Sequence, residues 1–279
     1  MLNQETILNE KNWVVNKYSK PYPFAQIDNF IDQITYNKLV EVFPSLQDFL
    51  DLPGIKESIP EHGNYIAKMP FAIINNDKTS PWFEIGSYFV SQKFFYRMCE
   101  LYADDLNAYY PDLYEKVKAK SIKLGIAGFD NISDVDVLLD FQLGVNTPVK
   151  SLSTARGPHL DNRNVLYVGL CYFKDDDDPT NTGHYTAYQL KPTKKLRLGP
   201  RRSVKLSDVT EFAQVKYDKN RLATFMNTID SIHGVSQREI TEYCRKFFVF
   251  NAVVNQNLYQ VDPGFTDRVM KRVKNIFNM

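Results

Sequence analysis

From about residue 121 onward, short apolar segments alternate with turn residues, and this pattern constrains the fold more than any other feature of the sequence. The segments are rich in β-branched and aromatic residues, as strands are: 135–144, 157–161, 164–173, 184–190, 202–206, 213–217, 221–227 and 245–254. Many short strands joined by turns are typical of an antiparallel sandwich or barrel such as a jelly roll. We therefore expect a mainly β core over residues 121–255.

The first 120 residues show helix-start signals in addition to a strand-like stretch. A strand-like stretch at residues 22–31 runs into Asp32, which is a suitable N-cap for a following helix. Ser80-Pro81 predicts a second helix start, because serine caps and proline suits the first turn. We expect helices over residues 82–103 and 106–118, so residues 1–120 are predicted to form a largely helical portion.

The chain is expected to form a single α+β domain over residues 1–279. No internal repeat or low-complexity linker divides it. Residues 263–279 begin with Pro263-Gly264, and the amphipathic pattern after this pair predicts a closing helix. The N-terminal helices and this last helix would then pack on the β core.

Composition narrows the class of protein. The 279 residues are 43% hydrophobic and 24% charged, which permits a substantial core. The net charge of +1 gives no argument for a nucleic-acid or membrane partner. Three cysteines without a CxxC pair indicate reduced thiols, and neither a signal-peptide segment nor a membrane-length apolar run is present. These features predict a soluble, cytoplasmic protein.

Two of the four histidines belong to a metal-ligand pattern. His159 and Asp161 lie two residues apart, so their side chains share a face if the segment is extended. His233 follows a strand-like segment and would stand at its exit turn. Two imidazoles and one carboxylate on one side of a metal are typical of non-haem Fe(II) oxygenases, although a three-ligand zinc site uses the same residue types.

Arg245 is the second unusual residue. It lies twelve residues after His233 and opens the apolar segment RKFFVFNAVV. Burying a guanidinium is costly unless it meets an anion, and its planar fork matches a carboxylate. Arg245 is therefore a candidate anion receptor. Arg238, the rival cation, lies in the polar stretch SQREITE and is expected to be exposed.

Taken together, these motifs resemble those of the 2-oxoglutarate/Fe(II)-dependent dioxygenase superfamily. The resemblance runs over residues 20–255, through FQLG, RGPHLD, LYVGLCYF, TGH, SIHGV and Arg245. The opening PYPFAQIDNFI is similar to prolyl-hydroxylase-like members, and the RGPHxD segment to an uncharacterised bacterial and phage-type branch. The chain departs from many members in two respects. Gly183 is followed by His184, where many members have a second glycine. Arg245 lies slightly farther from His233 than the corresponding basic residue of those members does.

The resemblance implies a double-stranded β-helix, which is a jelly-roll or cupin-like fold. It implies that Fe(II) binds to His159, Asp161 and His233, and that Arg245 holds the distal carboxylate of the co-substrate 2-oxoglutarate. The implied reaction hydroxylates a substrate with release of succinate and CO2, and ascorbate would support turnover. Further candidates are Tyr167 and Tyr188 for the co-substrate, and Arg156, His184 and Asn227 for the substrate or for contacts behind the ligands.

The substrate and the oligomeric state are left open by the sequence, and a small molecule or a protein side chain both fit. One alternative is a non-enzymatic or zinc-bound cupin-like barrel that binds small molecules and tolerates loss of Arg245. Another is a nucleic-acid-modifying or nucleic-acid-binding protein that uses the basic segment 191–202. The second is disfavoured because no aromatic residues interleave with these charges, and a solvated excursion is expected there.

Overall fold

The computed structural model describes residues 7–8 and 13–261 and contains two β-sheets. The larger sheet has the strand order β1-β2-β9-β6-β11-β5-β3, with β4 parallel to β5. Its strands are β1 (Val14–Tyr18), β2 (Phe24–Asp28), β3 (Ile66–Pro70), β4 (Leu124–Ile126), β5 (Val137–Asn146), β6 (Val165–Phe173), β9 (Arg221–Met226) and β11 (Arg245–Val254). The smaller sheet has the order β10-β7-β8, from His233–Val235, Tyr185–Leu190 and Val209–Val215.

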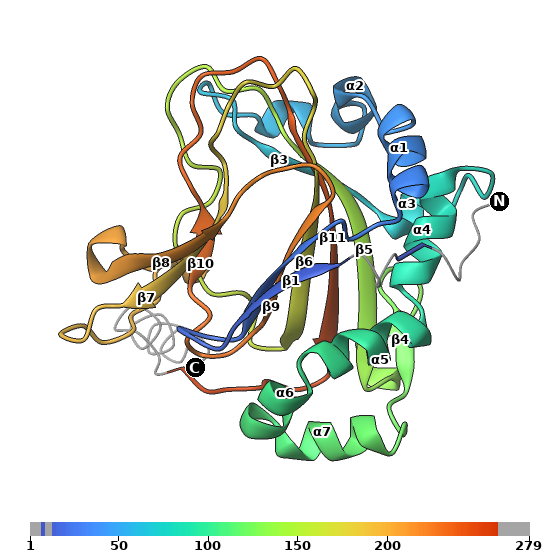
Figure 1. Cartoon of the computed structure of the whole chain (residues 1–279), viewed down its shortest axis with the longest axis vertical. Helices are drawn as coiled ribbons and strands as arrows, with labels where there is room; N and C mark the ends of the chain where they lie inside the picture. The colour runs from blue at the N-terminus through green and yellow to red at the C-terminus, as the bar shows by residue number, and fades with distance from the viewer. Residues whose placement is uncertain (1–6, 9–12, 262–279) are drawn as a thin grey trace, which may run out of the picture.

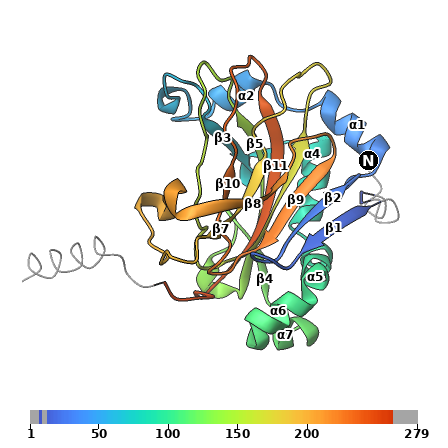
Figure 2. The ribbon, with the colours of Figure 1, turned by 60° about the vertical axis from the view of Figure 1, so that its left-hand side comes forward.

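The two sheets face each other (Figure 1), and the buried side chains of one hydrophobic cluster come from both of them. Along β11, Phe247 and Val249 point into this inner core, whereas Phe248 and Phe250 point to the opposite face. That opposite face is covered by the helices, which gives three layers of helix, large sheet and small sheet (Figure 2). Apart from the short parallel strand β4, both sheets are antiparallel, and their face-to-face arrangement confirms the predicted double-stranded β-helix core.

The N-terminal portion contributes strands as well as helices. The helices are α1 (Gln33–Glu41), α2 (Leu46–Leu50), α3 (Phe71–Ile74), α4 (Pro81–Phe89), α5 (Gln92–Leu101), α6 (Ala103–Tyr109) and α7 (Pro111–Lys118). Asp32 caps α1 by accepting a hydrogen bond from the Thr35 amide, as predicted. The helix predicted over residues 82–103 is interrupted, because Ser91 caps a new helix and accepts from the Phe94 amide.

Two of the predicted strands, residues 157–161 and 202–206, are wrong as continuous strands. His159 forms isolated antiparallel bridges to His233 of β10 and to Ser203, so the segment pairs with the edge of the small sheet at this one residue. Pro158 has no N–H to donate, and Arg201 and Arg202 have φ values of 53° and 59°, which are incompatible with a strand. The predicted closing helix, residues 263–279, lies outside the described residues. Within residues 7–8 and 13–261, no helix is long and apolar enough to cross a membrane.

Candidate metal centre and neighbouring anion site

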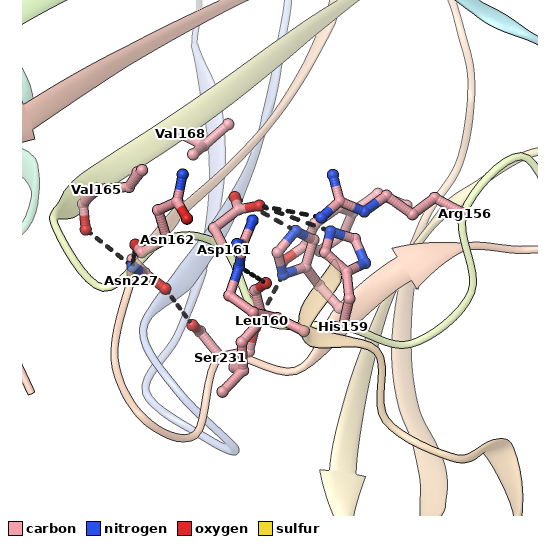
Figure 3. A network of polar contacts seen from close by, with 12 residues as sticks. Arg156, His159, Leu160, Asp161, Asn162, Val165, Val168, Asn227 and Ser231 are labelled. Carbon is pink, nitrogen blue, oxygen red and sulfur yellow. Dashed lines mark hydrogen bonds and ion pairs between the residues drawn. The ribbon is translucent and has the colours of Figure 1, made fainter. Parts of the chain in front are cut away.

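His159 and His233 are brought together by their own backbones. The His159 amide donates to the His233 carbonyl at 2.9 Å, and the His233 amide donates back to the His159 carbonyl at 3.0 Å. The two rings lie 4.3 Å apart between centroids. Asp161 faces both, with 3.6 Å from its Oδ1 to His159 Nε2 and 3.7 Å from its Oδ2 to His233 Nε2 (Figure 3). One ligand atom from each residue therefore lies within 4.8 Å of the others.

The hydrogen bonds of the two rings set their tautomers. His159 Nδ1 lies 2.8 Å from the Gly157 carbonyl oxygen, and His233 Nδ1 lies 2.8 Å from the Ser231 carbonyl oxygen. Because a carbonyl only accepts, each Nδ1 must carry the hydrogen. In the neutral form of each ring, Nε2 then has the lone pair, on the side of Asp161, which is the arrangement that metal-binding histidines adopt.

The electrostatics of the three residues also suit a divalent cation. Burial, together with the neighbouring His159, lowers the pKa of His233 to about 3. Burial acts against ionisation of Asp161, but His233, His159 and Arg156 outweigh it and hold the pKa of this carboxyl well below its usual range. At neutral pH the centre therefore has a neutral His233 and an ionised Asp161, ready to bind a metal without losing a proton first.

Asn227 connects the two segments that carry the ligands. Its Nδ2 donates to the carbonyls of Asn162 and Val165, both at 2.9 Å, and its Oδ1 accepts from Ser231 Oγ at 2.8 Å (Figure 3). Asn162 follows Asp161 in the chain, and Ser231 precedes His233 by two residues. Asn227 thus acts as a positioning residue behind the triad, and its side chain is occupied by protein contacts.

Two further contacts fix the segment that contains His159. A Cβ on Gly234 would lie 2.9 Å from the Gly157 carbonyl carbon, so only glycine allows this close approach. On the other side, Arg202 exchanges hydrogen bonds with Leu160: the Leu160 amide donates to the Arg202 carbonyl, and Arg202 Nε donates to the Leu160 carbonyl, both at 3.1 Å. One end of the basic segment 191–202 therefore braces the centre, although much of the segment is exposed.

Arg245 is buried at 2% exposure on the inner face of β11, between three aromatic rings. Its guanidinium carbon lies 4.7 Å from the centroid of Tyr172 and 5.3 Å from those of Tyr217 and Phe247. Nη1 donates to Asn146 Oδ1 at 3.1 Å, but Nε and Nη2 have no hydrogen-bond partner. Among the described residues, no carboxylate lies within ion-pair distance of it.

Four buried polar atoms without a hydrogen-bond partner belong to Arg245 and to two residues beside its guanidinium. Besides Arg245 Nε and Nη2, the buried Asn146 Nδ2 and Tyr172 hydroxyl also lack partners. A buried donor without an acceptor is costly, and a carboxylate accepts several donors at once. The cluster therefore fits an organic anion. His184 lies on the same side: its Nδ1 accepts from the Tyr217 amide at 3.0 Å, and burial and the Arg245 charge lower its pKa.

Arg238 is not exposed, contrary to the expectation from its polar sequence. It is 4% exposed, and its guanidinium donates to Asn64 Oδ1, the Thr147 carbonyl and the Tyr243 carbonyl at 2.8–3.1 Å. Gly183 makes room for it, since a Cβ there would lie 3.0 Å from Arg238 Cγ and 3.2 Å from Arg245 Cδ. In contrast to Arg245, Arg238 is thus held by the protein itself.

Of the other predicted site residues, two tyrosines lie outside the group around Arg245, and Arg156 lies beside the triad. Tyr167 points to the helix-covered face of β6, and Tyr188 lies in a small cluster with Leu160 and Ile232, so neither belongs to the group around Arg245. Arg156 lies beside the triad, with Nη2 4.0 Å from Asp161 Oδ1. Sequence reasoning missed the residues that surround Arg245, which are Asn146, Tyr172 and Tyr217.

Comparison with solved structures finds two prolyl hydroxylases and HygX among the matches, all at low sequence identity. A prolyl-4-hydroxylase from Pseudomonas putida is 10% identical with a TM-score of 0.42, covering 84% of this chain and 92% of that one. HygX from Streptomyces hygroscopicus, solved with nickel and 2-oxoglutarate, is 14% identical with a TM-score of 0.37, covering 83% and 82%. A prolyl hydroxylase from Trichoplax adhaerens is 10% identical with a TM-score of 0.40, covering 96% and 91%.

No family model matches the chain, and no curated protein matches it. At TM-scores below 0.5 the overlap is too loose to transfer a ligand set or a substrate.

Proposed function

We propose that this protein is an Fe(II)- and 2-oxoglutarate-dependent dioxygenase that hydroxylates its substrate. The observation that supports this most strongly is the combination of two sites. A preorganised His-x-Asp…His triad lies in the same fold as a buried arginine that has unpaired donors and no acidic partner. The first suits a divalent metal, and the second suits a carboxylate.

The residues divide into two groups under this proposal. His159 Nε2, His233 Nε2 and the Asp161 carboxylate would hold Fe(II). Arg245, with the free donors of Asn146 and Tyr172, would hold the distal carboxylate of 2-oxoglutarate. When bound, the iron supplies the redox chemistry that couples decarboxylation of 2-oxoglutarate to insertion of one oxygen atom of O2 into a substrate C–H bond.

The protein's own contribution is orientation and exclusion of water. The aromatic rings around Arg245 keep water from this cation, which strengthens its interaction with a bound carboxylate. The backbone pairing of His159 with His233 fixes two ligands before the metal arrives. Binding therefore requires little rearrangement of the triad.

Turnover in the absence of substrate gives the direct test. Purified protein with Fe(II), 2-oxoglutarate, ascorbate and O2 is expected to release succinate, and His159→Ala and Asp161→Ala are expected to abolish the release. Because such turnover can be slow, 2-oxoglutarate is also titrated into metal-loaded protein without oxygen. A wild-type protein that neither releases succinate nor binds 2-oxoglutarate would refute the proposal.

The donor set of the triad also suits zinc, which supports a second candidate, a zinc-bound barrel that binds small molecules without redox chemistry. This candidate leaves the unpaired donors of Arg245 without a ligand. It predicts that zinc is retained and that Arg245→Ala is without effect on ligand binding. The 2-oxoglutarate titration therefore separates the two candidates.

A further inference from the structure

A surface groove of about 630 Å³ lies outside the metal centre and the Arg245 site. Residues of the turn between β1 and β2, the end of α6, strands β7 and β8 and the loop before β10 line it, and this turn lies against β7 (Figure 1). Ile232, which directly precedes the ligand His233, belongs to the lining. The groove is therefore a separate hollow that shares one loop with the metal centre.

Three large apolar side chains of the groove are open to solvent. Tyr109 is 41%, Phe212 45% and Ile229 38% exposed. Leu190 and Leu196 continue the same lining and are only partly buried. Single exposed apolar residues are normal on a protein surface, but several of them in one hollow are typical of a place that another segment or molecule covers.

Asp230 is the acid of the groove, and its carboxylate has no partner. The Asp230 amide donates to Thr228 Oγ1, and its carbonyl accepts from the Ile232 amide. In the described part of the chain, its side chain forms neither a hydrogen bond nor an ion pair. An arginine from a covering segment suits this position, because its apolar stem can lie on the groove while its guanidinium meets the carboxylate.

Residues 262–279, which lie outside the described residues, have a sequence that complements this groove. The sequence places four apolar residues at i, i+4, i+8 and i+11, on one face of a helix, namely Phe265, Val269, Val273 and Ile276. Arg268 and Arg272 flank that face in the same helical pattern. An isolated helix of this length is marginal in water, so it needs a surface on which to bury its apolar face.

The described chain approaches the groove before it reaches this segment. The Tyr259 hydroxyl donates to Asn227 Oδ1 at 3.4 Å, and Asn227 precedes Ile229 of the lining by two residues. The Tyr110 hydroxyl donates to the Asn227 carbonyl at 2.7 Å, and its neighbour Tyr109 also lines the groove. A connection of about six residues spans up to about 20 Å. The segment can therefore reach the groove without any change in the described fold.

We propose that residues 265–279 dock in this groove as a helix. Their apolar face lies on Phe212 and Ile229, and an arginine lies beside Asp230. The occupant is thus the chain's own C-terminal segment, which covers the exposed apolar lining and rests on the loop that leads to His233. Docking requires neither metal nor 2-oxoglutarate, so it goes beyond the proposed function and is tested separately from it.

Hydrogen exchange of the full-length protein, followed by mass spectrometry, tests the docking, with a synthetic peptide of residues 262–279 as the reference. In the wild-type protein, the amides of residues 266–279 are expected to exchange at least about tenfold more slowly than in the peptide, because they exchange only when the helix opens. Phe212→Asp and Ile229→Asp each place a carboxylate under the apolar face, and both are expected to bring exchange to within about twofold of the peptide. Asp230→Asn is expected to speed exchange about threefold, the loss of one exposed ion pair.

Two controls accompany these variants. Leu152→Asp makes the same kind of change at a residue that is 60% exposed and does not line the groove, and it is expected to keep the wild-type protection. Thermal unfolding of every variant shows whether it is folded, so that a loss of protection confined to residues 266–279 is distinguished from general unfolding.

Three outcomes would overturn the inference. If the segment exchanges as fast in the wild-type protein as in the peptide, it does not dock. If it is protected but stays so in folded Phe212→Asp and Ile229→Asp, it docks elsewhere. If its protection is lost on dilution of the protein, the groove takes the segment of a second copy instead of its own. The proposed function stands in each of these cases, because none of them involves the metal ligands or Arg245.

Discussion

Substituting Arg245 by methionine is expected to stabilise the protein in the absence of 2-oxoglutarate. The guanidinium is 2% exposed and leaves two donors unpaired, each of which costs about 1–3 kcal/mol. Its bond to Asn146 and its contacts with the rings offset only part of that cost, and a buried charge without a counter-ion adds to it. We expect Arg245→Met to raise the free energy of unfolding by about 1–3 kcal/mol.

The same substitution at Arg238 provides a matched control with the opposite sign. Arg238 is also buried, but it donates to Asn64, Thr147 and Tyr243, and its loss leaves these acceptors unpaired. We expect Arg238→Met to lower the free energy of unfolding by about 2–4 kcal/mol. Urea unfolding of both variants with and without metal and 2-oxoglutarate measures the effect.

Without 2-oxoglutarate, Arg245→Met is expected to be more stable to unfolding than the wild-type protein. With 2-oxoglutarate, the wild-type protein is expected to be the more stable of the two. At a concentration 100 times its Kd, a ligand stabilises the folded state by about 2.7 kcal/mol, and only the wild-type protein is expected to gain this. The reasoning is refuted if Arg245→Met is destabilised as strongly as Arg238→Met, or if it is stabilised by 2-oxoglutarate as much as the wild type.

Three further predictions concern the metal centre. Gly234→Ala is expected to weaken metal binding at least about tenfold, because the added Cβ displaces the Gly157 backbone; calorimetric titration with Mn(II) checks this, and unchanged affinity contradicts it. Asn227→Ala is expected to weaken metal binding about 10- to 100-fold, since the segments of Asp161 and His233 lose their link, and a purely structural role would lower stability alone. Because the pKa of His233 is lowered to about 3, the unfolded metal-free chain takes up its proton first as the pH falls below about 6.5. Stability should therefore fall from pH 7 to pH 4, and more for wild type than for His233→Gln; equal slopes in urea unfolding would exclude this cause.

Most strands of the core and the metal triad could be predicted from the sequence because both follow local rules, whereas residues 157–161 and 202–206 form only isolated bridges. Turn residues delimit the strands of the core, and the spacing of His159 and Asp161 places two ligands together on an extended segment. The position of His233 directly after a strand-like segment predicts that it lies at the end of a strand, where a metal ligand can stand. None of these inferences required knowledge of which face of a strand is the inner one.

The surroundings of Arg245 could not be predicted because β6 is buried on both faces. Its run LYVGLCYF has no alternation of polar and apolar residues, so the sequence does not tell whether Tyr167 or Tyr172 points inward. The structure places Tyr172 in the inner core and Tyr167 under the helices. Similarly, Arg238 is buried by tertiary contacts with Asn64 and Thr147, which lie far away in the chain.

Metal-dependent binding of 2-oxoglutarate tests the central claim most directly. Calorimetric titration without oxygen compares wild-type protein with and without Fe(II), and Asp161→Ala with Fe(II). If His159, Asp161, His233 and Arg245 form one site for metal and co-substrate, 2-oxoglutarate binds tightly only to the Fe(II)-loaded wild-type protein. Equal binding with and without metal, or no binding under either condition, would contradict the claim.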